Sequence, residues 1–214
     1  MKKILLASAL AFSFLASAQI DFRNTRFGLT AGANYSRVKN AHNPSGARLA
    51  FQGGVLALIP MGSSNQFFLQ PEVVYYGAGE SGKDKDAKGI AGYDAMYANN
   101  YISVPVSFKG YFSEAESEFF GLIGPRFNFL LDQKVTKESR EIYRTDKLGK
   151  ANSFNFAIGL GIGYSYKRQL ELALKYDLGL SNTYPTLDES KIDPNSAKKK
   201  SEQVLSLSLS YIFN

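Results

Sequence analysis

Six charged residues lie within stretches of sequence in which apolar side chains alternate with small or polar ones. They are Glu72, Lys109, Arg126, Glu171, Lys175 and Asp177, three acids and three bases. Each occupies the polar side of its stretch, so paired strands would collect them on one face of a sheet. Charges gathered in a confined interior either form ion pairs that fill it or line a path for ions or protons. The equal numbers of acids and bases favour a plug of ion pairs. We expect Glu72 near Lys109 or Arg126, and Lys175 near an acid.

Two other sets of residues could carry chemistry, and both are better explained without it. His42 is the only histidine, and a histidine in a loop can act as a general base beside a serine. No accompanying motif surrounds it, so we expect a solvated side chain. Gly159, Gly161 and Gly163 are spaced by two and no helix follows them, whereas a dinucleotide-binding loop needs a strand, a turn and a helix. We expect these glycines to leave room for long side chains from opposite strands, and we predict no enzyme activity, cofactor or metal site.

The composition narrows the class of protein. The 214-residue chain has no cysteine, which excludes disulfides, thiolate metal sites and a lipid anchor on a cysteine. Tyr and Phe supply all of its 14% aromatic residues and 19 glycines accompany them, a combination that suits β-structure better than helix. The formal charge of +6 is spread over segments that also carry acids, so we expect no nucleic-acid partner.

The N-terminal segment has the order of a secretory signal peptide. Lys2 and Lys3 precede an apolar core at 4–15, and the small residues Ala16 and Ala18 flank Ser17 just before Gln19. We predict a signal peptide at 1–18, cleaved between Ala18 and Gln19. No later apolar run approaches the roughly 20 residues of a membrane helix. The mature protein is therefore either soluble in an exported compartment or crosses a membrane as a barrel.

Eight stretches of about ten residues show the alternation expected of a strand with two different faces. They cover 26–36, 49–59, 67–77, 101–112, 119–131, 154–166, 170–179 and 205–213. The segments that join them alternate between long and polar (38–48, 78–100, 132–152 and 181–203) and short (60–66, 113–118 and 167–168). This order places every long loop at one end, as in outer-membrane barrels with long extracellular loops and short periplasmic turns. We predict a short periplasmic segment at 19–25 and an all-β, eight-stranded antiparallel up-and-down transmembrane β-barrel at 26–214, in the cell outer membrane.

Aromatic side chains on the apolar faces support a membrane barrel over a soluble one. Near the short turns they are Phe27, Phe67, Phe112, Phe119, Tyr164, Tyr166, Tyr211 and Phe213, and near the long loops they are Tyr35, Phe51, Tyr75, Phe127, Phe129, Phe154 and Tyr176. Aliphatic residues lie between the two groups, as expected for two interfacial girdles around a lipid-facing band. Pro71, Pro105 and Pro125 fall within three of the strands, where we expect bulges or strand ends.

Several short motifs resemble a known family. The segment from Gln70 to Tyr76, QPEVVYY, and the segment from Tyr101 to Val106, YISVPV, are similar to the third and fourth strands of PorT-like outer-membrane β-barrel proteins. Residues 121–126, 176–180 and 211–213 are similar to later strands, so the resemblance spans nearly the whole mature chain. It implies an eight-stranded barrel in the outer membrane. The founding member is associated with protein secretion, a role that we do not transfer to this chain.

These observations leave two main functions and one remote one. The first is a non-enzymatic barrel with a plugged polar interior, whose loops serve interaction or envelope integrity. The second is a transport component, either a small channel or a secretion accessory. The remote one is a lipid-modifying enzyme that uses His42. The partners we expect are outer-membrane lipids, the barrel-assembly machinery and secretion-system or envelope proteins, with lipopolysaccharide as a further candidate for basic loop residues such as Lys198, Lys199 and Lys200.

Overall fold

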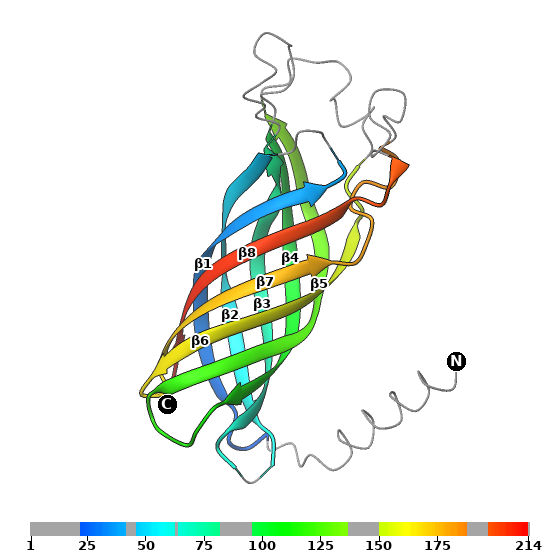
Figure 1. Ribbon diagram of the computed structural model, residues 1–214. Helices are drawn as coiled ribbons and strands as arrows, with labels where there is room; N and C mark the ends of the chain where they lie inside the picture. Colours follow the sequence, from blue (N-terminus) through cyan, green and yellow to red (C-terminus); the bar gives the residue numbers. More distant parts are fainter. Residues whose placement is uncertain are drawn as a thin grey trace, which may run out of the picture.

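The computed structural model describes residues 22–41, 46–62, 64–81, 96–136, 150–187 and 197–213, and within them eight strands form one closed barrel. The strands are β1 (Arg26–Lys39), β2 (Gly46–Pro60), β3 (Phe67–Ser81), β4 (Met96–Tyr111), β5 (Glu118–Thr136), β6 (Phe154–Tyr166), β7 (Leu170–Gly179) and β8 (Ser201–Ile212). Each strand pairs antiparallel with the next, and β8 returns to pair with β1 (Figure 1). The predicted eight-stranded up-and-down barrel is therefore confirmed. No helix long and apolar enough to cross a bilayer occurs among the described residues.

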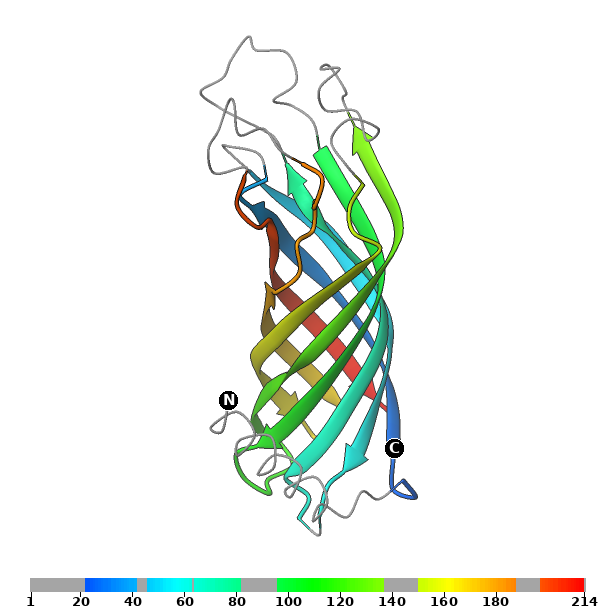
Figure 2. The ribbon, with the colours of Figure 1, turned by 90° about the vertical axis from the view of Figure 1, so that its right-hand side faces the viewer.

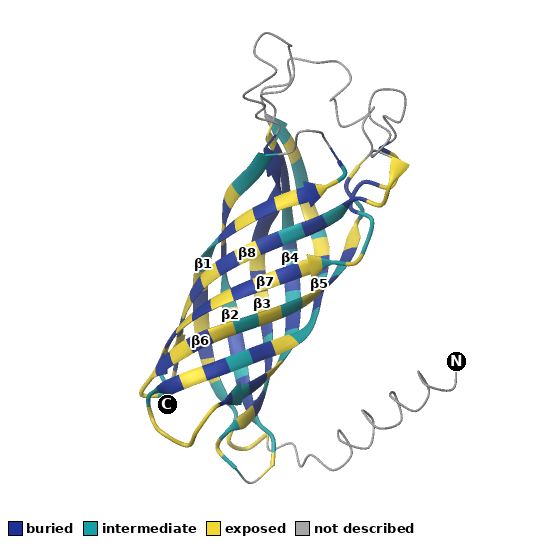
Figure 3. Cartoon of the chain, viewed as in Figure 1, coloured by how far each residue is buried: buried dark blue, intermediate teal, exposed yellow. Residues whose placement is uncertain are grey.

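Burial along the strands follows a period of two, because successive side chains of a strand point to opposite faces. In β7 the residues Glu171, Ala173, Lys175 and Asp177 are buried, and the leucines and tyrosine between them are exposed (Figure 3). The aromatic residues predicted for the two girdles are exposed on the outside, except Phe127, which is half-buried beside Phe156. The outer surface of the barrel therefore carries an apolar band, and the polar residues that alternate with this band point into the lumen.

The strands differ in length around the barrel. Those of β1 to β5 have 14 to 19 residues, whereas β6, β7 and β8 have 13, 10 and 12. The longer strands extend the wall at the end opposite the turns at 61–66, 112–117 and 167–169 (Figure 2). The expected loop at 38–48 is correspondingly wrong, because only 40–45 separate β1 from β2 and polar residues on either side continue the pairing. This connection is no longer than two of the short turns.

The three strand prolines do not mark bulges. Pro71 pairs with Val106 and Pro125 with Ile158, and the register is the same on both sides of each pair. Pro105 lies opposite Arg126 in the same way. The register shifts instead occur after Ala47 in β2 and after Asn100 in β4. The expected bulges at prolines are therefore wrong, because a proline removes a single backbone donor and the pairing continues beyond it.

Candidate functional site

Strand β7 supplies one member of each of three ion pairs that cross the lumen. Its hydrogen-bonded neighbours are β6 and β8. Its three inward charges nevertheless pair with residues of other strands, Glu171 with β4, Lys175 with β3 and Asp177 with β5. These contacts must therefore run through the interior of the barrel. They connect β7 to three strands that are not its neighbours in the sheet.

All six charged residues predicted for the interior take part in these pairs. Lys109 bonds Glu171, the Nζ of Lys175 lies 2.9 Å from Oε1 of Glu72, and the Nε of Arg126 lies 3.1 Å from Oδ1 of Asp177. The side chains of all six are at most 10% exposed. The ion pair of Glu72 is with Lys175, which was expected near an acid, and Glu72 also interacts electrostatically with Arg126, as expected from the sequence. Sequence spacing gave the inward face of each residue but not its height in the tilted barrel.

Further hydrogen bonds support each of the pairs. Gln70 donates to Glu72 at 2.8 Å, and Tyr76 donates to Asp177 at 3.0 Å. Arg126 also donates to the hydroxyl of Ser103 at 3.1 Å. The Tyr111 hydroxyl donates to Glu171 at 2.5 Å. A charge buried without such partners would cost several kcal/mol, so the network makes a charged interior tolerable.

The lumen holds little free space between these side chains. One cavity of about 10 Å³ lies beside Tyr76, Asn128 and Glu202, and a second of about 10 Å³ lies beside Pro105, Gly159 and Lys175. Each volume corresponds to roughly one water molecule. An open space of about 550 Å³ lies near the short turns, where Asn65, Phe68 and Arg168 line it. The described part of the interior is therefore filled at the level of the ion pairs.

The end of the lumen near the short turns is apolar, which corrects the expectation of a polar interior throughout. Its cluster consists of Leu56, Leu58, Phe68, Tyr111, Phe120, Leu122, Ala173 and Ile212. The ring of Tyr111 meets those of Phe68 and Phe120 edge-on, with centroids 5.5 and 5.7 Å apart. The ammonium of Lys109 lies 4.8 Å from the centroid of Tyr111 and 4.2 Å from that of Phe120. An aromatic layer thus closes the lumen below the ion pairs.

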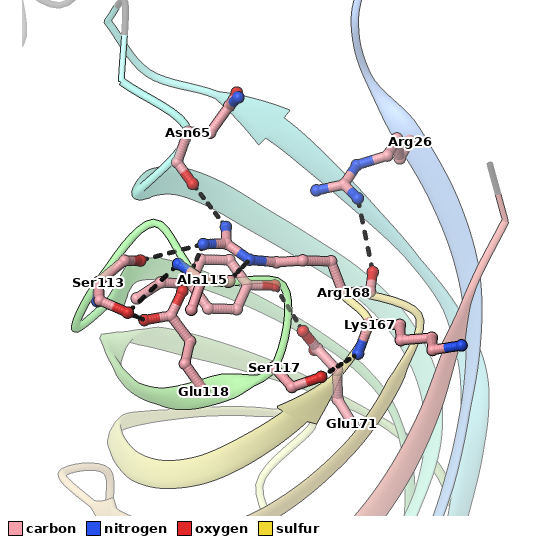
Figure 4. Close-up of polar contacts among 10 residues, drawn as sticks. Arg26, Asn65, Ser113, Ala115, Ser117, Glu118, Lys167, Arg168 and Glu171 are labelled. Atoms are coloured by element: carbon pink, nitrogen blue, oxygen red, sulfur yellow. Dashed lines mark hydrogen bonds and ion pairs between the residues drawn. The ribbon is translucent and has the colours of Figure 1, made fainter.

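Arg168 holds the three short turns together at the rim of this aromatic layer (Figure 4). Its guanidinium donates to the carbonyls of Asn65, Ser113 and Ala115 at 2.5, 3.0 and 3.1 Å. It also forms an ion pair with Glu118 and lies 3.8 Å from the ring centroid of Tyr111. We call this set of contacts of Arg168 the turn clasp.

The backbone that presents Arg168 is itself unusual. Lys167 and Arg168 have φ angles of 52° and 56°, in the left-handed region that Asn and Gly adopt more readily. Two consecutive left-handed residues form the tight turn between β6 and β7. Ser117 supports it by accepting a hydrogen bond from the Lys167 N–H at 2.9 Å, and Arg26 donates to the Arg168 carbonyl at 3.4 Å. Sequence reasoning placed Arg168 and Glu118 in turns and gave them no role, because turn residues lack the two-residue period that marks an inward side chain.

A second set of residues that the sequence pattern did not identify lies at the end of the barrel away from the short turns. Tyr184 follows β7, is buried, and packs in an apolar cluster with Val38, Ala41, Tyr97, Ala151 and Leu187. Asn99 donates to the Tyr184 hydroxyl at 2.9 Å and approaches Glu202 at 3.4 Å. Burial raises the pKa of the Tyr184 phenol well above its usual value, so this hydroxyl stays protonated. The alternating pattern identified strands only, and Tyr184 lies outside them.

The glycines of β6 make room for side chains of the adjacent strands rather than of opposite ones. A Cβ at Gly163 would overlap the ring of Phe120 on β5 and lie 2.6 Å from the carbonyl oxygen of Leu172 on β7. A Cβ at Gly159 would lie 2.6 Å from the carboxylate of Asp177. These glycines are therefore needed for the aromatic layer and for one ion pair.

Three residues singled out from the sequence fall elsewhere in the chain. Ala18, Gln19 and His42 lie outside the described residues. Within the described ranges, no group of three or more His, Cys, Asp or Glu side chains is arranged to hold a metal ion.

Residues 16–184 match the family described as outer membrane protein beta-barrel domain. The chain belongs to this family. As a member of the outer membrane protein beta-barrel domain family, it is a transmembrane protein of the outer membrane. No curated protein matches the chain.

Several solved structures are similar to this family member in fold. Ail of Yersinia pestis is 12% identical, with 88% of this chain and 98% of Ail covered and a TM-score of 0.43. Neisserial surface protein A is 13% identical, with 87% and 97% covered and a TM-score of 0.45. A major outer membrane protein from Thermus thermophilus is 16% identical, with 89% and 100% covered and a TM-score of 0.48.

Proposed function

We propose that this protein is a closed, non-conducting outer-membrane barrel that acts through its surface, in interaction or envelope integrity. The observation that carries the proposal is the set of three ion pairs by which β7 reaches β3, β4 and β5 across the lumen. Eight strands enclose a space just wide enough for side chains to fill. A protein whose interior is occupied in this way has its outer face and its loops available for function.

Conduction would require a rearrangement of the interior. An ion that crossed the lumen would have to separate at least one buried pair, and a buried charge without its partner costs several kcal/mol. It would then meet the layer of Phe68, Tyr111 and Phe120 and the turn clasp below it. These three layers in series support the interaction role over the role of a self-sufficient channel.

A planar-bilayer recording tests the proposal directly. We expect no steady channel from the purified full chain, because the pairs and the aromatic layer occupy the path. The variant Arg126→Ala removes one bridging side chain, and any conductance it gains should come with a loss of stability. A steady, selective conductance of the unmodified protein that Arg126→Ala abolishes would contradict the proposal and favour the transport role.

The finer assignments extend the same proposal. The motifs at 70–76 and 101–106 support membership in the PorT-like group of outer-membrane barrels. We place no catalytic step on this chain and expect its partners to be outer-membrane lipids, the barrel-assembly machinery and envelope or secretion-system proteins. Cross-linking in intact outer membrane identifies protein partners. Recovery of secretion-system components as the main cross-linked species would favour the accessory role in secretion.

A further inference from the structure

A group of cations stands on the outer face of the barrel where β1 and β8 meet. Arg37 and Lys39 are exposed on β1, at positions that point outward like Tyr35. Lys199 is also exposed and lies two residues before β8. Asn40 donates a hydrogen bond to the Lys199 carbonyl at 2.9 Å, which fixes Lys199 beside the end of β1. We call Arg37, Lys39 and Lys199 the basic patch.

The outward positions next to the patch carry no acid. Arg37 pairs with Gln203 and Lys39 with Ser201, both uncharged. Glu202, between them in β8, is buried, which places it on the other face of the strand. Among the described residues, the side chains of Arg37 and Lys39 have no ion pair, and the Lys199 ammonium bonds the Leu180 carbonyl. The charge of the patch is therefore not neutralised by the described part of the protein.

On the opposite wall of the barrel, an exposed cation has a counter-ion. Lys134 on β5 is 70% exposed, and its Nζ lies 3.3 Å from a carboxylate oxygen of Asp132. This cation has its counter-ion on the same strand. Lys134 therefore provides a matched control for the basic patch.

The patch lies just beyond the lipid-facing band. Tyr35 is 59% exposed, and its neighbours Leu49 on β2 and Leu205 on β8 are 66% and 42% exposed. Aromatic residues at the edge of such a band mark the membrane interface. At a rise of about 3.3 Å per residue, Arg37 and Lys39 stand about 7 and 13 Å further along the strand than Tyr35. They are therefore at the depth of lipid headgroups, at the end of the barrel away from the short turns.

We propose that the basic patch binds the phosphate groups of an anionic glycolipid in the outer leaflet, the chemistry of lipopolysaccharide. A guanidinium and two ammonium groups at headgroup depth complement phosphates, and the apolar face below them contacts the acyl chains. The inference rests on the proposed function for the orientation of the barrel. Of the run of lysines expected from the sequence, the patch keeps Lys199 but not Lys200, because Lys200 is buried and its ammonium bonds the Leu187 carbonyl.

Native mass spectrometry with bisphosphorylated lipid A as the probe tests the proposal. The purified full chain in detergent micelles is titrated with this lipid, and the apparent Kd of the first bound molecule is measured. The variant R37Q/K39Q/K199Q should bind about 100-fold more weakly, because each cation near an anionic lipid surface contributes a factor of roughly five. The control Lys134→Gln should bind as the unmodified protein does. Dephosphorylated lipid should bind the unmodified protein as weakly as lipid A binds the triple variant.

Each outcome decides the proposal. Heat-modifiable migration on a gel confirms that the variants are folded, which is expected because all three substitutions are on the surface. Equal affinity of the triple variant and the unmodified protein would overturn the proposal, as would an equal loss with Lys134→Gln. Competition by inorganic phosphate at the concentration of the lipid would show that a free anion, and not a lipid, is the ligand. Conductance in a planar bilayer with intact phosphate-dependent lipid binding would contradict the proposed function alone.

Discussion

The lumen and its rim near the short turns are both held by charged side chains, but in different surroundings. In the lumen both members of each pair are buried, and Lys109 is 0% exposed. At the rim the side chain of Arg168 is 12% exposed, and three of its partners are backbone carbonyls of turns. A buried charge that loses its partner has no water to replace it, whereas turn carbonyls can bond solvent. Breaking an ion pair in the lumen should therefore cost more free energy than breaking the contacts of the turn clasp.

Lys109→Met should have the largest effect, because it leaves the Glu171 carboxylate buried with the Tyr111 hydroxyl, at 2.5 Å, as its remaining hydrogen-bond donor among the described side chains. We expect a loss of about 3–5 kcal/mol in the free energy of unfolding. The measurement is the urea midpoint of the loss of heat-modifiable migration in detergent. The methionine itself suits the space between the Tyr111 and Phe120 rings.

The double variant K109M/E171Q provides the control for this experiment. Removal of both charges should restore most of the lost stability, since a buried pair is often replaceable by neutral groups of similar size. If the double variant were as unstable as the single one, packing rather than the unpaired charge would explain the loss. The greater sensitivity of the lumen would then come from its tight packing and not from its buried charges.

Gly163→Ala should have an intermediate effect, at the aromatic layer that separates the two regions. The added Cβ overlaps the Phe120 ring, and we expect a loss of about 1–3 kcal/mol from overpacking. Gly53→Ala is the matched control, because its Cβ would meet its nearest neighbour, the Thr30 carbonyl oxygen, at 3.6 Å. Urea midpoints of the two variants give the comparison. Equal midpoints would show that the aromatic layer accommodates the added methyl group without a loss of stability.

Arg168→Gln should have the smallest effect of the three. Glu118 keeps the Ser113 hydroxyl as a donor at 2.6 Å, so no buried charge is left alone. We expect a loss of about 1–2 kcal/mol, and faster proteolysis at the three short turns as they separate. Lys167→Ala, in the same turn, should leave both measurements unchanged. A loss as large as that of Lys109→Met would mean that the turn clasp is as essential as the ion pairs.

The sequence predicted the lumen better than the rim for a physical reason. A strand has a strict period of two, so the position of Glu171, Lys175 and Asp177 on one face of β7 follows from their spacing. The same pattern gave the outward aromatic residues and the order of the strands. It gave no information on Arg168 or Tyr184, because neither residue lies in an alternating stretch. The family membership of residues 16–184 supports the same architecture independently.

The sequence by itself determined the number of strands, their order and the face on which each strand residue lies. Only the tertiary structure decided the partners, such as Lys175 for Glu72, because these depend on the stagger between strands that never pair with each other. The tilt of the barrel sets this stagger. The stagger adds up over the strand pairings that lie between β7 and β3 around the barrel. The lengths of the strands beyond the membrane and the contacts of Arg168 with the other two short turns were decided in the same way. Local alternation is encoded residue by residue, whereas distances across a closed barrel exist only once it has closed.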